Sequence, residues 1–256
     1  MYFVFDVDGT ICFNGSFIEE DILNALEEIN KSHNLIFASA RPIRDLIPVL
    51  PNFKNNLLIG GNGSIISDKG DIKVIDYISS HEYVYLKQLI EEYNLNFIID
   101  GSINYSAKVD SNNIIYKQLD PMKLAKNIPF KEIERPIKVI LVNIPEKLYE
   151  EIVQKLDVIN SNITINYHRK DFNIDITAKG VNKYTTLKEI IGNSNYIGYG
   201  NDINDYDLLK NAYKSYYISQ YENTNLDFGI TEILPKNSKK IALSIQSHNK
   251  KDIKKF

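Results

Sequence analysis

The sequence predicts an α/β fold, built as a doubly wound parallel sheet that is interrupted by an inserted α+β module. Short apolar runs alternate with segments of helical periodicity over residues 2–59, as expected for such a sheet. From about residue 80 the pattern becomes typical of antiparallel strands, and the first pattern resumes after residue 170. We therefore expect a discontinuous α/β core, residues 1–79 and 171–256, with a separate module at residues 80–170.

The first half of the expected core contains three strands and two helices. The apolar runs at residues 2–5, 35–38 and 57–59 have the length and composition of buried parallel strands. Apolar residues recur at helical spacing over residues 17–29, and Pro42 suits the first turn of a helix that ends near Leu50. Residues 64–67 and 72–77 flank a turn that contains glycine, which predicts a hairpin.

The inserted module is expected to start with a helix near residue 80. Strands are predicted near residues 97–99, 103–105, 136–143 and 163–167, a helix at 147–156, and a further candidate strand at 114–116. The core then resumes with a strand at 172–176, a helix at 182–191, a buried strand at 196–199 and a helix at 205–212.

Composition and charge exclude several classes of protein. The chain has 256 residues, of which 43% are hydrophobic and 25% are charged, as in ordinary globular proteins. A net charge of -3 lacks the basic excess of a nucleic-acid binder, and no segment has the length of a transmembrane helix. The single cysteine, Cys12, excludes an internal disulfide and is expected to pack beside the first strand rather than to act as a nucleophile. We expect a cytoplasmic protein without a nucleic-acid or membrane partner.

Asp6 and Asp8 give the strongest signal for a functional site. The run Asp6-Val7-Asp8-Gly9-Thr10 begins where the first strand ends, and sites in open α/β sheets form beyond the carboxyl ends of the strands. Two carboxylates two residues apart can bind a hard cation and share the roles of nucleophile and acid/base. A solvated surface turn would explain Asp8 and Gly9, but it does not explain an aspartate directly after four apolar residues.

Three further segments place polar side chains at strand ends or helix starts. Ser39 follows the second strand, where its hydroxyl can bind a phosphate oxygen or simply cap the next helix. Lys183 opens a helix and can balance carboxylate and phosphoryl charge, although a lone lysine in this position is more often solvated. The loop after residue 200 carries Asn201, Asp202 and Asp205, whose oxygens suit magnesium or calcium, or else an Asx-rich turn that caps a helix.

Taken together and in this order, the four segments resemble the haloacid dehalogenase superfamily, and specifically its Cof-type sugar-phosphate phosphatases. Asp6, Asp8, Gly9 and Thr10 match the D-x-D-G-T motif of the family, and the resemblance covers nearly the whole chain. It implies a Rossmann-like core and a magnesium-dependent phosphatase in which Asp6 attacks phosphorus to form an aspartyl-phosphate. Asp8 would protonate the leaving alcohol and then activate water.

The resemblance also assigns the remaining site residues. Residues 39–41 (S-A-R) stand where the family has T-G-R, and residues 180–183 (G-V-N-K) match its G-V-x-K motif, which makes Lys183 catalytic. Asn62 matches an N-G element that lies near the phosphate in the family. The resemblance thus implies the following residues around the substrate phosphate: Thr10, Ser39, Ala40, Arg41, Asn62 and Asn204.

The fourth motif departs from the family pattern. Its usual form is G-D-x-x-N-D, and Asn201 stands where the metal-binding aspartate is expected. An amide oxygen can coordinate magnesium with less charge, or Asp202 can reach the ion directly or through water. The expected metal ligands are therefore Asp6, Asp8, Asn201, Asp202 and Asp205. The segment that usually follows this motif is hard to recognise after residue 216.

The insertion resembles the C2 cap of the family, an α/β module that covers the site and selects the substrate. His168, Arg169 and Lys170 could meet an anionic substrate there, but a solvated hinge is the preferred interpretation. Two other functions stay open, because the resemblance extends to phosphomannomutases, which are phosphohexomutases, and because Asn201 leaves room for a non-catalytic sensor of a phosphate ligand. The expected partner is a small phosphorylated metabolite, and the sequence leaves both its identity and the oligomeric state of the protein open.

Overall fold

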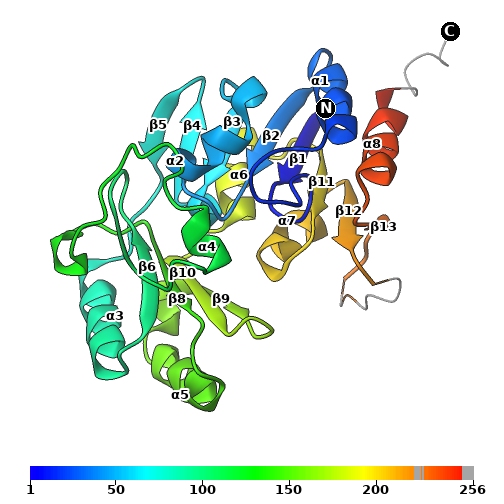
Figure 1. The fold of residues 1–256 in the computed structure, drawn as a ribbon. Coiled ribbons are helices and arrows are strands. Elements are labelled where there is room, and N and C mark those ends of the chain that lie inside the picture. Colours follow the sequence, from blue (N-terminus) through cyan, green and yellow to red (C-terminus); the bar gives the residue numbers. More distant parts are fainter. Residues whose placement is uncertain (222–225, 227, 250–256) are drawn as a thin grey trace, which may run out of the picture.

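The computed structural model describes residues 1–221, 226 and 228–249 (Figure 1). These residues form two sheets with helices packed against them. The larger sheet has eight strands in the order β13-β12-β11-β1-β2-β3-β4-β5, and the smaller has five in the order β7-β6-β8-β10-β9. In the sequence, all five strands of the smaller sheet lie between β5 and β11 of the larger sheet. The smaller sheet is therefore an insertion in the larger fold.

The strands of the larger sheet run parallel from β13 to β3, and β4 and β5 continue it as an antiparallel hairpin. The reversal of strand order beside β1 is the feature that defines a doubly wound sheet, so the predicted fold class is confirmed. The strands are β1 (Tyr2–Asp6), β2 (Asn34–Ala38), β3 (Leu57–Gly60), β4 (Ile65–Asp68), β5 (Asp71–Val74), β11 (Tyr196–Gly200), β12 (Lys214–Ser219) and β13 (Glu232–Pro235).

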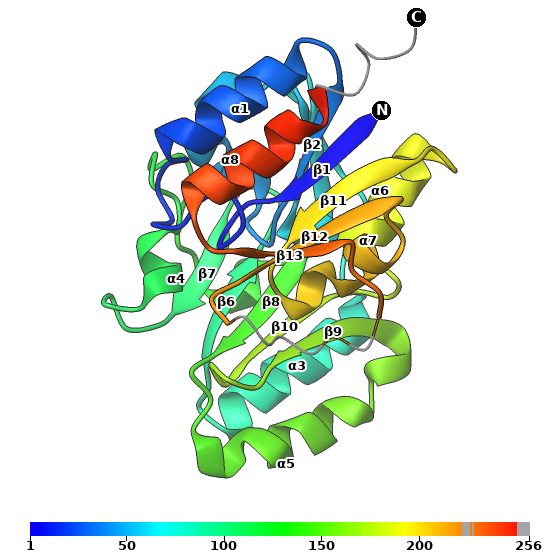
Figure 2. The same cartoon turned by 90° about the vertical axis from the view of Figure 1, so that its right-hand side faces the viewer.

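Helices cover both faces of the larger sheet (Figure 2). On one face α1 (Glu20–Asn30) and α8 (Ser238–Ser247) lie side by side, and their buried residues join one hydrophobic cluster with alternate residues of the central strands. On the other face α6 (Lys183–Ile191) and α7 (Tyr206–Lys210) bury a second cluster. The period of two along β1 explains this division, because Phe3 and Phe5 belong to the first cluster and Val4 to the second.

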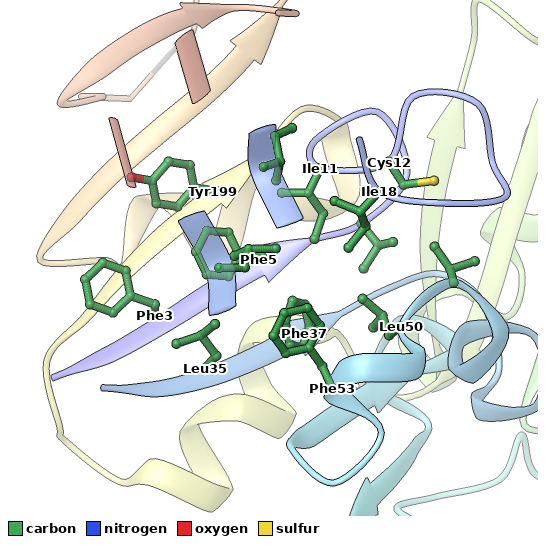
Figure 3. Close-up of a cluster of buried hydrophobic side chains, with 14 of the residues drawn as sticks. Phe3, Phe5, Ile11, Cys12, Ile18, Leu35, Phe37, Leu50, Phe53 and Tyr199 are labelled. Carbon is green, nitrogen blue, oxygen red and sulfur yellow. The ribbon is translucent and has the colours of Figure 1, made fainter. Parts of the chain in front are cut away.

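Stacked aromatic rings hold the middle of the first cluster (Figure 3). The ring of Phe5 stacks on Tyr199 with centroids 4.9 Å apart and on Phe37 at 6.0 Å, which joins three neighbouring strands. Offset-stacked pairs of this kind add to the free energy gained by burying the rings. Cys12 lies in the same cluster with 1% of its surface exposed, so its interpretation as a packing residue is confirmed.

The smaller sheet is antiparallel throughout, and its two long helices lie on the same face. Helices α3 (Ser80–Glu92) and α5 (Glu146–Asp157) pack against that face in a third hydrophobic cluster, and Figure 2 shows them on the side away from the larger sheet. The opposite face is turned toward the ends of β1, β2 and β11. Its strands are β6 (Asn96–Asp100), β7 (Tyr105–Lys108), β8 (Lys138–Val142), β9 (Ile163–His168) and β10 (Asn173–Ala178).

The connections hold only short helices. Helix α2 (Ile43–Leu46) is shorter than predicted, because Pro48 lacks an N–H and the chain continues in 3-10 turns. Helix α4 (Ile114–Lys117) lies in the insertion, and no described helix is long and apolar enough to cross a membrane. The 3-10 turns are at Ile47–Val49, Pro51–Phe53, Gly61–Gly63, Phe130–Glu132, Asn160–Asn162 and Ile203–Asp205.

Two sequence predictions are wrong. Residues 114–116 are helical, because the side chain of Asn113 accepts hydrogen bonds from the N–H groups of Ile115 and Tyr116 and so caps a helix. The strand predicted at residues 172–176 is β10 and pairs with β8 and β9 in the smaller sheet. Because the turn between β9 and β10 makes a local hairpin, the chain returns to the larger sheet only after Ala178 and not at residue 171.

The helix that delivers Lys183 depends on a glycine. Gly63 has a φ of +104°, and a Cβ atom there would lie 2.4 Å from the carbonyl oxygen of Asn182, which caps α6. Gly70, in the turn of the β4–β5 hairpin, has a φ of +93° but no atom within 4 Å of the same position. The two glycines share a left-handed backbone and differ in the space around them.

We expect Gly63→Ala to lower the free energy of unfolding by about 3 kcal/mol or more, since strain and a backbone clash act together. Gly70→Ala should cost only about 1 kcal/mol, for its left-handed backbone. Urea unfolding followed by circular dichroism measures both values. Equal losses in the two variants would contradict the close packing between Gly63 and the cap of α6.

Candidate active site

The predicted site residues come together at the carboxyl ends of the central strands. Asp6 is the last residue of β1 and lies beside Ala38, the last residue of β2. The loop that follows β11 meets them from the other side, because β11 pairs with β1 in parallel register. The crevice at the centre of a doubly wound sheet therefore holds the polar segments that the sequence singled out.

Lys183 joins two buried carboxylates. Its Nζ donates to Oδ1 of Asp6 and to Oδ1 of Asp205, each at 2.7 Å, and no more than 4% of any of the three residues is exposed. Burial and the nearby charge of Asp205 raise the pKa of Asp6 to about 7, although Lys183 and Thr10 oppose the shift. Burial lowers the pKa of Lys183, but attraction to Asp205 and Asp6 outweighs it and the net shift is upward. The lysine is thus held as a cation between the two acids.

The local sequence around Lys183 explains its position. Asn182 caps α6 through a reciprocal pair: its side chain accepts from the N–H of Thr185 at 2.8 Å, and Thr185 Oγ1 accepts from its backbone N–H at 2.9 Å. Thr186 Oγ1 then donates to the carbonyl oxygen of Gly63 at 2.8 Å, which fixes the helix against the loop after β3. As the first residue of this helix, Lys183 is directed at Asp6.

Asp205 organises the loop after β11. Its Oδ2 accepts from the backbone N–H groups of Asn201 at 3.0 Å and Asp202 at 3.1 Å, while its other oxygen accepts from Lys183. A Cβ atom on Gly200 would lie 2.6 Å from Cβ of Asp205, so glycine is required for this close approach. Both oxygens of Asp205 are therefore engaged within the protein, and its predicted role as a metal ligand stays a prediction.

Asp202 is also engaged elsewhere. Its Oδ1 accepts from the N–H of Ile203 at 2.7 Å, and its Oδ2 lies 3.0 Å from Nδ1 of His168 in the insertion. The solvated-hinge interpretation of His168 is therefore wrong, because only 14% of its side chain is exposed. Arg169 fits that interpretation better, since it pairs with Glu150 at the surface.

Three oxygen atoms converge on the amide of Asn201. Oδ2 of Asp6, the carbonyl oxygen of Asp8 and Oγ1 of Thr10 each lie 2.9 Å from the same end of this amide. The proton of Thr10 is directed to Oδ2 of Asp6 at 2.7 Å, so all three oxygens can accept when the amide nitrogen faces them. The two N–H groups of the amide can thus donate to two of these three oxygens at a time.

The same atoms fit a magnesium ion once the amide turns its oxygen toward them. A carboxylate, a main-chain carbonyl and an amide oxygen are ligands that Mg²⁺ accepts, and neighbouring ligands at about 2.1 Å from the ion lie about 3 Å apart. The 2.9 Å separations match that spacing. Within residues 1–221, 226 and 228–249 no three His, Cys, Asp or Glu side chains come together as a candidate metal cluster.

Asp8 faces the crevice and is oriented by Arg41. The guanidinium of Arg41 donates to both carboxylate oxygens, from Nε at 2.7 Å and from Nη2 at 2.6 Å, and Nη2 also donates to the carbonyl oxygen of Gly15 at 2.8 Å. The side chain of Arg41 is 7% exposed and that of Asp8 is 37% exposed. The structure therefore gives Arg41 a bidentate carboxylate partner, whereas the sequence assigned it to the substrate phosphate.

The other predicted phosphate residues form the floor between the two sheets. Ser39 Oγ accepts from the backbone N–H of Arg41 at 3.1 Å, so it acts here as a turn cap. Asn62, with a φ of 56°, donates from Nδ2 to Asp175 at 2.8 Å and accepts from Asn204 at 3.1 Å. The carbonyl oxygen of Ala40 accepts from Lys138 at 3.0 Å.

A cavity of about 240 Å³ lies above these residues, between the strand ends and the open face of the smaller sheet. Sequence analysis missed most of the residues that the insertion contributes to it, among them Asp100, Lys138 and Asp175. A signal was present, because each is the only charged residue of its strand. Their shared face became visible only when the strands were placed in register.

The model of the haloacid dehalogenase-like hydrolase family matches residues 3–224. The chain belongs to this family. The family and fold named from the sequence motifs are thereby confirmed, and so is the expectation of a hydrolase. No curated protein sequence matches the chain.

Solved structures of the haloacid dehalogenase (HAD) family resemble the whole chain. BT4131, described as a HAD subclass IIB sugar phosphatase, is 19% identical with a TM-score of 0.75, over 97% of this chain and 98% of that one. A protein of Thermotoga maritima is 18% identical with a TM-score of 0.76, over 96% of each chain. BT1666, a HAD phosphatase of Bacteroides thetaiotaomicron, is 16% identical with a TM-score of 0.73, over 97% and 94%. At these identities the likeness establishes the fold.

The contacts of Lys183 lead to a prediction about stability. Lys183→Met should lower the free energy of unfolding by about 3–5 kcal/mol in the presence of a chelator, because two buried carboxylates lose their shared cation. Lys188→Met, on the exposed side of the same helix, should change it by less than about 0.5 kcal/mol. Chemical denaturation measures both. A Lys183→Met variant as stable as Lys188→Met would show that the two acids do not need the lysine.

Proposed function

We propose that this protein is a magnesium-dependent phosphatase that hydrolyses a small phosphorylated metabolite through an aspartyl-phosphate. One observation carries the proposal. Asp6 lies buried at a strand end with one oxygen on Lys183 and the other on Thr10, and Asp8 faces the same crevice two residues later. A nucleophile and a separate acid/base group are thus fixed side by side.

Asp6 is the proposed nucleophile. One of its carboxylate oxygens attacks the phosphorus atom, the bond between phosphorus and the ester oxygen breaks, and the phosphoryl group stays on Asp6. Lys183 and Thr10 hold the carboxylate in one orientation, and the cation of Lys183 offsets the negative charge that gathers around phosphorus. Water then attacks the same phosphorus atom, the bond between phosphorus and the Asp6 oxygen breaks, and inorganic phosphate leaves while the carboxylate of Asp6 is restored.

Asp8 is the proposed acid and base. It gives a proton to the departing ester oxygen and later takes one from the attacking water, so each turnover restores its starting state. The guanidinium of Arg41 holds both oxygens of Asp8 in a fixed plane. The side chain of Asp8 is half-exposed and can still reach the cavity. We therefore assign Arg41 to the positioning of Asp8.

Magnesium fits beside Asp6. We propose that Asp6, the carbonyl oxygen of Asp8 and the amide oxygen of Asn201 hold the ion, while Asp202 and Asp205 support the loop. When bound, the ion screens the repulsion between the carboxylate of Asp6 and the phosphate. Asp6, Asp8 and Lys183 carry out the nucleophilic attack, the proton transfer and the charge stabilisation described above.

The size of the cavity supports a small substrate. A volume of about 240 Å³ is below the range of roughly 300–1,000 Å³ that is usual for drug-sized ligands. BT4131, which has the same fold, is described as a sugar phosphatase, and a sugar phosphate is the class we would test first. The cytoplasmic location inferred from the sequence stays a prediction.

Replacement of the nucleophile tests the mechanism. Asp6→Asn should lower kcat for phosphate release by about 10³-fold or more, since an amide is a poor nucleophile of the same shape. Asp71→Asn, at an exposed position of β5, should keep kcat within about twofold. Phosphate release from a panel of sugar phosphates measures the rates, and ³¹P spectra of the same mixtures would reveal an isomer if the protein were a mutase. Activity of Asp6→Asn near that of Asp71→Asn would exclude the covalent mechanism.

The amide of Asn201 leads to a prediction about the metal. Without magnesium, Asn201→Asp should lower the melting temperature. The substitution replaces an amide that donates to Asp6 with a third carboxylate beside Asp6 and Asp205. With magnesium, the variant should gain more in melting temperature than the wild type and should bind the ion about tenfold more tightly in calorimetry. If Asp202→Asn weakens magnesium binding strongly and Asn201→Asp leaves it unchanged, then Asp202 is the ligand.

A further inference from the structure

The open face of the smaller sheet carries a patch of buried charge. Side chains alternate along its strands, so Phe97, Ile99 and Val139 pack under the helices while their neighbours face the cavity. In the register of the sheet, Asp100 of β6 lies opposite Lys138 of β8. Asp175 of β10 lies opposite Ile140, two residues further along β8 and therefore on the same face. Three adjacent strands thus place Asp100, Lys138 and Asp175 on the cavity wall.

These three residues are fixed by contacts with the larger fold. Lys138 lies 3.0 Å from Oδ2 of Asp175, and this oxygen also accepts from Asn62. Asp100 accepts from Arg44 at 3.1 Å through Oδ1. The positions of the three charged groups are therefore set before any ligand arrives, as a selective site requires.

The wall has an excess of negative charge. Arg44 is shared between Asp100 and Asp45, to which it donates two hydrogen bonds of 2.7 Å. With Lys138 and Asp175, three carboxylates face two cations. His168 adds no excess of positive charge, because its nearest partner is Asp202. A second anionic group on a substrate would meet net repulsion here.

Two carboxylate oxygens on this wall have no partner in the described part of the chain. The contacts of Asp100 use Oδ1, and those of Asp175 use Oδ2. Neither residue is more than 6% exposed. In the described part of the chain neither oxygen is among the fully buried side-chain atoms without a partner, so each is open to the cavity, and the cavity is the place from which a hydrogen-bond donor can come.

We propose that Asp100, Lys138 and Asp175 form the subsite for the leaving group, which selects phosphate esters that carry hydroxyl or ammonium groups and rejects those that carry a second anion. The proposal rests on the phosphatase function. The free oxygens of the two aspartates accept from the donors of the leaving group. Lys138 offers its remaining N–H to a hydroxyl oxygen. Ile98 and Ile140 line the same wall and suit the C–H face of a small ring or chain.

A matched pair of substrates tests the selectivity. Glycerol 3-phosphate and 3-phosphoglycerate share a phosphate ester and differ in a terminal hydroxymethyl group or carboxylate. The wild type should have a value of kcat/KM about tenfold or more higher for glycerol 3-phosphate. Phosphoethanolamine, which carries an ammonium group, should also be preferred over 3-phosphoglycerate. Equal values for the pair in the wild type would overturn the proposal.

Two substitutions should move this preference in opposite directions. Asp100→Asn removes a negative charge and should lower the preference for glycerol 3-phosphate about tenfold, mainly through KM. Lys138→Met removes a positive charge and should increase it. Asp157→Asn, on the exposed end of α5, serves as the control that leaves the ratio unchanged. If Asp100 and Lys138 had only a structural role, the two substitutions would shift the ratio of the kcat/KM values in the same direction. That result would overturn the proposal.

A general substrate separates this inference from the proposed function. p-Nitrophenyl phosphate has neither a hydroxyl nor a second anion on its leaving group. If the wild type releases phosphate from it and does not discriminate within the matched pair, the phosphatase function stands and the subsite is wrong. If the wild type releases phosphate from none of these esters, both proposals fail.

Discussion

The rest of the site depends on the two ion pairs that Lys183 makes, one with Asp6 and one with Asp205. They join the end of the first strand, the start of α6 and the loop after β11, three segments that are far apart in the sequence. Because the two acids are buried, loss of the lysine would leave two carboxylates without their shared cation. The capping pair at Asn182 and the close packing at Gly63 and Gly200 all serve to bring these three charges together.

The two sheets meet through polar contacts, and these contacts link the reacting groups to the cavity wall. Lys138 bonds to the loop that carries Arg41, Asp175 to Asn62, and His168 to the loop of Asn201. Each of these three contacts thus ends on a loop at the strand ends that border the site. Selection of the leaving group and orientation of the nucleophile are therefore parts of one hydrogen-bonded network.

The sequence was sufficient to predict the core as far as α7, because its signals there are local, but β12, β13 and α8 were not predicted. Apolar runs mark the parallel strands, and Asp6 after such a run marks the site. The insertion was harder to read, since antiparallel register is set by pairing between distant strands. The strand at residues 173–178 looked like a return to the core because its apolar residues fit either sheet. Arg41 matches a motif position and Asp202 lies within the fourth motif, but their partners, Asp8 and His168, depend on geometry that a one-dimensional pattern does not contain.

The contact between the sheets also has a thermodynamic character of its own. Each hydrophobic cluster belongs either to the larger sheet or to the insertion. The exception is Ile137, directly before β8, which packs into the core of the larger sheet. Any separation of the two sheets would therefore divide no hydrophobic cluster except at Ile137, and it would expose little apolar surface that is now buried between them. Exposure of apolar surface raises the heat capacity and exposure of polar surface lowers it, so such an opening would leave little calorimetric trace. It would depend instead on ionic strength, since salt screens the ion pairs that hold the cavity closed.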